Sequence, residues 1–236
     1  MKENLSASVL FTFTPKMEYL LQMLQRGITP RYVYERLPVG KKYYIAPMKC
    51  FCDIPLGKVK NHMQRYGFYG LGLKKSFLQE HRVTPVVYLH KNSLAHFNLN
   101  RKAGANMEDV PFLPLLKRYL GDDYFFSESS NQTQKKRIHF YDEREWRYIP
   151  EGYKLEVTNG FKTIEEGLRH VLKMNEDTAQ QFAPLKIPID AVDYIIIRKR
   201  KELARALSEL RQIFGSEDID LLYTKVLIAE NIISDF

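Results

Sequence analysis

The sequence predicts an α+β fold in a single domain over residues 1–236, with a mixed or antiparallel central sheet and helices packed on it. A hydrophobic content of 44% and an aromatic content of 13% are those of a protein with a packed core. The predicted strands do not alternate regularly with long crossover helices, which argues against a doubly wound sheet. We find no internal repeat, low-complexity tract or linker that would divide the chain.

The N-terminal half predicts strands separated by short helices. A strand at Ser8–Thr14 is followed by Pro15, and this pair predicts a helix start, because a hydroxyl can cap the first turn and Pro suits the first helical position. Gly27 would end that helix, and a loop would follow it. Pro85–His90 is apolar and is expected in the centre of the sheet. The other elements predicted here are strands at Tyr43–Asp53 and Phe68–Leu73 and helices at Lys58–Tyr66, Lys74–Glu80, Leu94–Asn100 and Pro111–Leu120.

The C-terminal half begins with the most loop-like stretch of the chain, the polar segment Gly121–Lys136. Further on, Thr163 and Glu166 have the spacing of a capping box, which predicts a helix that starts there. The remaining predicted elements are strands at Ala191–Arg198 and Leu221–Ala229 and an amphipathic helix at Glu202–Phe214.

The segment His139–Pro150 holds the only Trp and the densest mixture of carboxylate, guanidinium and aromatic groups. Strand geometry places alternate residues on opposite faces. One face would hold Glu143, Glu145 and Arg147, and the other Arg144, Trp146 and Tyr148. We expect the Trp146 face to pack on a core and the carboxylates to point into a cleft. The alternative is an exposed polar face with an ion pair worth roughly 0–1 kcal/mol.

The formal charge of +8 favours anionic partners such as nucleic acid, nucleotides or an acidic protein. The basic residues are dispersed, with short clusters at Lys135–Arg137 and Arg198–Lys201, so the same charge is as compatible with solubility as with binding. No apolar run approaches the ~20 residues of a membrane span. The first residues lack the pattern of a signal peptide, so we expect a cytoplasmic protein with no membrane partner.

The two cysteines are Cys50 and Cys52. A disulfide between residues two apart is strained, so their spacing fits a reducing compartment. Two thiols are also too few for a zinc site; His62 could join them in principle, but we expect no metal.

The common catalytic motifs are missing. The chain has no phosphate-binding loop, dinucleotide fingerprint, nucleophile elbow or paired histidines with zinc-protease spacing. His62 and Tyr66 lie four residues apart, so a helix would place them on one face. With Lys75 and Glu145 they could line one pocket. The alternative is a core histidine beside a packed tyrosine.

Four segments resemble the AbiGi family of abortive phage-infection proteins: Ala46–Leu56, His62–Lys75, Pro85–Tyr88 and Phe140–Arg147. The similarity spans roughly residues 9 to 230. It implies a role in bacterial antiviral defence by abortive infection, at a toxin–antitoxin locus that would supply a partner protein. The customary family label is antitoxin, which rests on operon position.

A second set of residues resembles ADP-ribosyltransferase-like folds of the DarT type. Thr12-Phe13-Thr14 occupies the place of a His-x-Thr motif, where Thr14 matches and Thr12 replaces the histidine. Glu145 matches the catalytic glutamate, and Ile189–Ile197 resembles a later strand of the fold. This resemblance implies an ADP-ribosyltransferase-like fold and NAD as a substrate.

Under that resemblance Glu145 would stabilise the cation that forms when the nicotinamide–ribose bond breaks. Arginine and lysine would hold the pyrophosphate, and Tyr69 would stack on the nicotinamide or adenine. The candidate catalytic residues are Glu145, His62 and Tyr66, and the candidate cofactor-binding residues are Thr12, Thr14, Arg31, Tyr69, Lys75 and Arg147.

Three functions follow from the sequence. The first is an ADP-ribosyltransferase-like effector that uses NAD to modify nucleic acid or protein during phage defence. The second is a non-catalytic antitoxin, or another binding partner of a toxin in a defence pair. The third is a sensor that binds a nucleotide without turnover.

Overall fold

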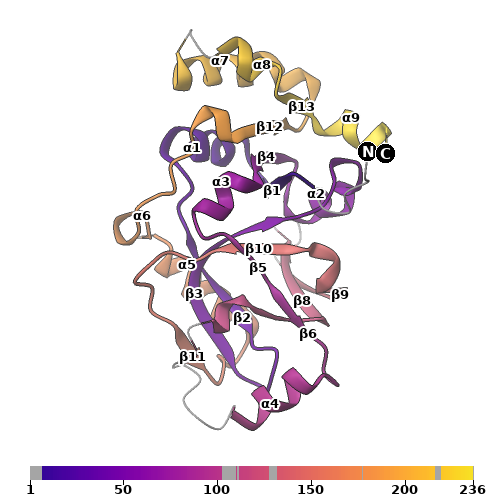
Figure 1. The fold of residues 1–236 in the computed structure, drawn as a ribbon, viewed down its shortest axis with the longest axis vertical. Coiled ribbons are helices and arrows are strands. Elements are labelled where there is room, and N and C mark those ends of the chain that lie inside the picture. Colours follow the sequence, from indigo (N-terminus) through magenta and orange to yellow (C-terminus); the bar gives the residue numbers. More distant parts are fainter. Residues whose placement is uncertain are drawn as a thin grey trace. The chain divides into compact units, whose positions relative to one another are not determined.

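The computed structural model describes residues 7–102, 110, 112–127, 132–176, 178–215 and 219–235. The chain forms two compact units, each assembled from separate segments (Figure 1). Unit 1 comprises residues 1–29, 50–83 and 184–236, and unit 2 comprises residues 30–49 and 84–183. Both units contain helices and mixed β-pairing, which confirms the α+β class. The assignment of residues 1–236 to a single domain stays a prediction.

The sheet of unit 1 has the strand order β13-β12-β4-β1, and the last residues of β3 pair with β1. The β12–β13 pair is parallel, whereas β12–β4 and β4–β1 are antiparallel. The sheet is therefore mixed, as the sequence predicted. The strands are β1 (Val9–Thr14), β3 (Tyr43–Cys52), β4 (Tyr69–Lys74), β12 (Val192–Ile197) and β13 (Val226–Ile228).

Two glycines of β4 allow aromatic rings from neighbouring strands to cover the sheet. A Cβ at Gly70 would lie 2.7 Å from the ring of Phe13, and one at Gly72 would lie 2.8 Å from the ring of Phe11. Both rings belong to the hydrophobic core of unit 1. The glycines thus permit close approach by side chains of this chain.

The first helix of unit 1 ends at Gly27, as predicted, and the second also ends at a glycine, but the first begins later than expected. Gly27 and Gly67 follow α1 and α2 with φ of +93° and +116°. Helix α1 starts at Met17 with Lys16 as N-cap, so the predicted start at Thr14 is wrong because Thr14 continues the extended strand β1. The helices of unit 1 are α1 (Met17–Arg26), α2 (Lys60–Tyr66), α3 (Lys75–Glu80), α7 (Leu203–Phe214), α8 (Ile219–Tyr223) and α9 (Ala229–Asp235).

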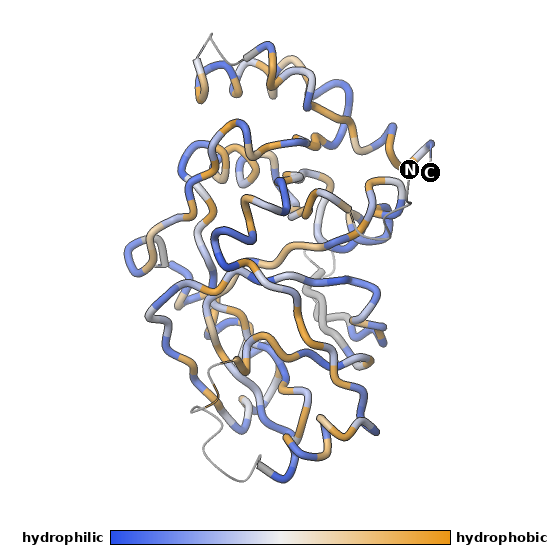
Figure 2. The backbone as a smooth tube through the Cα atoms, viewed as in Figure 1, coloured by the Kyte–Doolittle hydropathy of each residue, from blue (hydrophilic) through white to orange (hydrophobic). Residues whose placement is uncertain are grey.

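Helix α7 shows how a sequence pattern becomes a packed face. Ala206 and Leu210 are buried four residues apart, whereas Arg205, Ser208 and Arg211 on the same helix are exposed. The change between hydrophobic and hydrophilic positions is visible along this helix in Figure 2. No helix in the described part of the chain is both long enough and apolar enough to cross a membrane.

Unit 2 is built on β3, which is flanked by β2, β11 and β10, with β5 beyond β10. A parallel pair, β6–β7, and an antiparallel pair, β8–β9, accompany this sheet. The strands are β2 (Arg31–Arg36), β5 (Thr84–Pro85), β6 (Val87–Leu89), β7 (Leu116–Arg118), β8 (Leu120–Ser127), β9 (Gln132–His139), β10 (Glu145–Tyr148) and β11 (Glu156–Thr158). The helices are α4 (Leu94–Lys102), α5 (Ile164–Met174) and α6 (Thr178–Gln181).

Several predictions for unit 2 are wrong. The expected loop after the first helix contains β2, whose Tyr and Val residues favour a strand although charged residues separate them. The polar stretch Gly121–Lys136 belongs to the β8–β9 pair on both sides of residues 128–131, which lie outside the described residues. The helix expected at Pro111–Leu120 is a 3₁₀ turn at Leu113–Leu115 followed by β7, and the expected central strand Pro85–His90 is split between β5 and β6.

The capping box at the start of α5 is confirmed in part. The Thr163 hydroxyl accepts a hydrogen bond from the Glu166 backbone N–H at 3.2 Å. Glu166 in return accepts from the backbone N–H of Lys162, one residue before the cap. The helix therefore begins at Ile164, as the pattern predicted.

Candidate functional site

Strand β10 buries its charged face. Glu143 and Glu145 are each 6% exposed and Arg147 only 1%, whereas Trp146 and Tyr148 are half-buried. The predicted alternation is confirmed for Glu145–Tyr148, whereas Glu143 lies in a 3₁₀ turn and Arg144 has a φ of +44°, so the strand begins only at Glu145. The expectation that the Trp146 face is the core face is wrong. Charged groups occupy the buried face because oppositely charged groups compensate one another there, which is the condition for burying charge.

Arg147 is the centre of this arrangement. Its Nε donates to Glu145 Oε1 at 2.6 Å, and its Nη2 lies 2.7 Å from Glu35 Oε2. Its Nη1 donates to the Tyr44 hydroxyl at 2.6 Å and to the backbone carbonyl of Pro114. The planar guanidinium thus joins β2, β3 and β10 within unit 2, a role that a lysine could not fill with the same geometry.

Lys117, on β7, is the second cation. Its Nζ lies 2.5 Å from Glu145 Oε2, 2.9 Å from Glu143 Oε2 and 3.5 Å from Glu35 Oε1. Burial lowers the pKa of Lys117, but the three carboxylates outweigh burial and hold the pKa well above its ordinary value. We call Glu35, Lys117, Glu143, Glu145 and Arg147 the charge cluster.

Two tyrosines complete the hydrogen bonding around the charge cluster. The Tyr44 hydroxyl donates to Glu35, and burial raises its pKa well above the ordinary value. The Tyr88 hydroxyl accepts from the backbone N–H of Glu145 at 2.7 Å. Burial, together with the charge of Glu145, raises the pKa of Tyr88 as well. Both phenols therefore stay neutral well beyond the pH at which an exposed tyrosine ionises.

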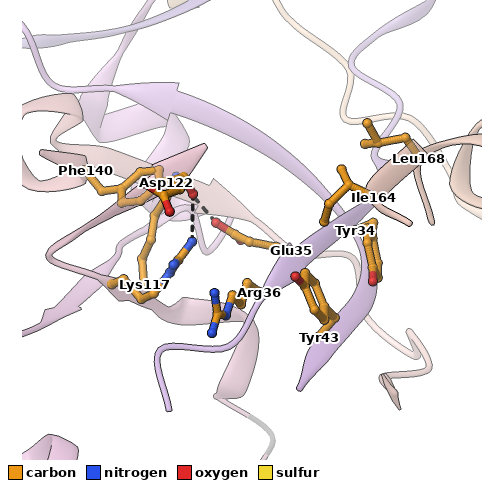
Figure 3. Close-up of a pocket in the computed structure, with 10 residues that line it drawn as sticks. Tyr34, Glu35, Arg36, Tyr43, Lys117, Asp122, Phe140, Ile164 and Leu168 are labelled. Atoms are coloured by element: carbon orange, nitrogen blue, oxygen red, sulfur yellow. Dashed lines mark hydrogen bonds and ion pairs between the residues drawn. The ribbon is translucent and has the colours of Figure 1, made fainter. Parts of the chain in front are cut away.

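A small cavity of about 70 Å³ lies next to the charge cluster (Figure 3). Glu35 and Lys117 line it, whereas Glu145 does not. Its other lining residues are Tyr34, Arg36, Tyr43, Arg118, Asp122, Phe140, Ile164 and Leu168. Pockets that hold whole cofactors usually measure several hundred Å³, so this cavity has room for only a few atoms.

His62 and Tyr66 lie in unit 1 and contact each other, as their spacing predicted. Their ring centroids are 4.5 Å apart, and His62 also lies 5.7 Å from the ring of Phe13. Tyr66 packs against the hydrophobic core of unit 1. These contacts favour the interpretation as a core histidine beside a packed tyrosine, and a catalytic role for the pair stays a prediction.

Two candidate cofactor residues of unit 1, Tyr69 and Lys75, have side-chain partners within the protein. The Tyr69 hydroxyl donates to Glu202 Oε1 at 3.0 Å, and burial together with Glu202 raises the pKa of Tyr69 to about 12. Lys75 forms an ion pair with Asp53 at 3.0 Å. Thr12 and Thr14 are both buried in β1. These residues belong to unit 1, whereas Arg31, at the exposed start of β2, belongs to unit 2 with Glu145 and Arg147.

The sequence did not predict that Lys117, Tyr44 or Tyr88 would be partners of Glu143 and Glu145. Each comes from a different strand, and only the folded sheet brings them together. For Glu35 the sequence did hold one signal, because this residue lies between Tyr34 and Arg36 in a segment rich in residues that favour a strand.

The fold and this site define a mixed α+β protein whose second unit is held by a buried ion-pair network. A family model described as "Putative abortive phage resistance protein AbiGi, antitoxin" matches residues 33–198. The chain therefore belongs to the AbiGi family. The matched region contains the whole charge cluster and most of unit 2.

One curated relative is named "Abortive phage resistance protein AbiGi", from Lactococcus lactis subsp. cremoris. It is 28% identical over 133 residues, an alignment that covers 47% of this chain and 53% of the relative. The chain thus spans about half the length of that relative. No solved structure matches the chain.

Proposed function

We propose that this chain acts in abortive phage resistance as an antitoxin, a non-catalytic protein that binds a toxin from the same bacterial defence locus. The names of the family and of the curated relative support the defence role. The formal charge of +8 favours an acidic toxin surface as the partner.

The state of Glu145 is the observation that supports a non-catalytic function. Both of its carboxylate oxygens are engaged, one by Arg147 at 2.6 Å and the other by Lys117 at 2.5 Å. A carboxylate that stabilises a developing cation must face the reacting atom. Glu145 instead compensates two buried cations of the protein, which is a structural task.

The competing hypothesis is an NAD-dependent ADP-ribosyltransferase-like effector with Glu145 as catalytic residue, acting on nucleic acid or protein. Its support is the sequence resemblance at Thr14 and Glu145. The small volume of the cavity beside the charge cluster favours the antitoxin over this enzyme.

Co-expression tests the antitoxin function. The chain, the protein encoded by the neighbouring gene, and both together are induced in a host that lacks the locus, and surviving colonies are counted. We expect the neighbour alone to arrest growth and the pair to grow. Growth arrest by the chain alone would contradict the proposal and would favour an effector.

An NAD assay tests the competing hypothesis directly. The purified chain is incubated with NAD and with nucleic acid or protein acceptors, and free nicotinamide is measured. The antitoxin function predicts no release above a buffer blank. Release by the natural chain that is lost in a folded Glu145→Gln variant would establish the enzyme instead.

A further inference from the structure

The cavity beside the charge cluster has one apolar wall and one charged wall (Figure 3). The rings of Tyr34 and Tyr43 stack with centroids 4.6 Å apart and planes inclined by 13°. Ile164 and Leu168, four residues apart on α5, extend this wall. A group that enters the cavity would therefore be partly shielded from water, and any charge interaction would be stronger there than in open solvent.

The carboxylates of the charged wall are already compensated by cations of the protein. Glu35 contacts Arg147 at 2.7 Å and Lys117 at 3.5 Å. Asp122 forms an ion pair with Lys135 at 3.0 Å, which lowers the pKa of Asp122. Neither carboxylate is thus an uncompensated negative charge that would repel an anion at full strength.

Arg36 differs from the other charged residues of this wall. It lies opposite Tyr43 in the β2–β3 pair and lines the cavity. Within the part of the chain that the structure describes, its guanidinium forms no ion pair or hydrogen bond. A guanidinium offers five donors in a planar fork that matches the oxygens of carboxylates and phosphates.

We propose that this cavity binds one compact oxyanion group, a phosphate or a carboxylate, with Arg36 as its principal ligand and the Tyr34–Tyr43 stack as its apolar wall. Arg118 also lines the cavity and adds positive charge. The volume of about 70 Å³ admits a group of a few atoms. This proposal is independent of the antitoxin function, because a rescue assay and an anion titration can succeed or fail separately.

Nuclear magnetic resonance of arginine side chains tests the site in the full chain. The Nε–Hε resonances are followed while inorganic phosphate, and in a second arm acetate, replaces chloride at constant ionic strength. We expect a saturable shift of the Arg36 resonance, and of the resonance of Arg118 in the same cavity, in at least one arm. The Arg36 resonance should be lost in Arg36→Gln, and binding followed at Arg118 should be at least tenfold weaker. Saturation by phosphate alone identifies a phosphate site, and saturation by acetate identifies a site that also accepts acidic side chains.

Two variants make the test specific. Arg36→Lys keeps the charge but loses the fork, so we expect binding between that of the natural chain and that of Arg36→Gln. Arg169→Gln removes an exposed charge from α5 and should leave the titration unchanged. The proposal is overturned if neither anion saturates any resonance, or if Arg36→Gln binds as tightly as Arg169→Gln.

Discussion

Replacement of Arg147 by Met tests the charge cluster most severely. The substitution fills a similar volume but removes the guanidinium that contacts Glu145 at 2.6 Å and Glu35 at 2.7 Å. Within the cluster, three carboxylates would then share Lys117 as their cation. Removing one partner of a buried ion pair costs about 3–5 kcal/mol. For a chain of this size that cost corresponds to a fall in Tm of roughly 6–20 °C.

The single tryptophan gives this prediction a local assay. Trp146 lies on β10 next to Arg147, so its fluorescence reports the unfolding of unit 2. Unfolding by urea, followed at this residue, should shift to lower denaturant in Arg147→Met and by a smaller amount in Arg147→Lys. Arg169→Met, which changes an exposed arginine of the same unit, should unfold like the natural chain. A Tm for Arg147→Met within about 2 °C of the natural value would refute the reasoning.

Three further predictions concern backbone, cap and alkaline stability. Gly67→Ala places a Cβ 2.1 Å from the Thr14 carbonyl oxygen at a φ of +116°, so thermal unfolding should show a loss of more than about 1 kcal/mol in the free energy of unfolding. Gly152→Ala, with φ of +68° and nothing within 4 Å, should lose about 1 kcal/mol. Equal losses in the two variants would count against the contact with Thr14. Thr163→Ala should cost about 0.5–2 kcal/mol in urea unfolding through loss of the α5 cap, and an unchanged midpoint would argue against that cap. Burial raises the pKa of Tyr44 in the folded chain above its value of about 10 in the unfolded chain. The contribution of the Tyr44 phenol to the free energy of unfolding is therefore fully present below about pH 10 and is lost as the pH rises from there toward the pKa in the folded chain. Urea midpoints should therefore fall between about pH 10 and 11 and fall less in Tyr44→Phe, and a flat profile in the natural chain would be inconsistent with the buried phenol.

Local signals in the sequence were sufficient to predict the ends of helices where those ends depend on neighbouring residues. Gly27 and Gly67 end helices because a positive φ is accessible to glycine, and Thr163 begins one because its hydroxyl meets the Glu166 N–H. The helix start at Thr14 failed because pairing of β1 with β4 extends to that residue, opposite Tyr69. Tertiary pairing there overrode the local capping signal.

Strand β10 shows the same difference between local and tertiary signals at the site. Alternation correctly placed Glu145 and Arg147 on one face, because strand periodicity is local, whereas Glu143 joins them from a 3₁₀ turn. Whether that face is buried depends on partners far away in sequence. Glu35 is 112 residues from Arg147 in sequence, and Lys117 is 28 residues from Glu145. The residues around Glu145 and Arg147 do not indicate either partner.

A rescue experiment with Glu145→Gln tests the central claim, that this acid is structural, most directly. The variant leaves two carboxylates facing two cations in the charge cluster, so we expect a smaller loss of stability than in Arg147→Met. It is co-expressed with the neighbouring protein at a temperature at which Trp146 fluorescence shows the variant to be folded. We predict rescue of growth equal to that of the natural chain. Loss of protection by the folded variant would contradict a purely structural role for Glu145.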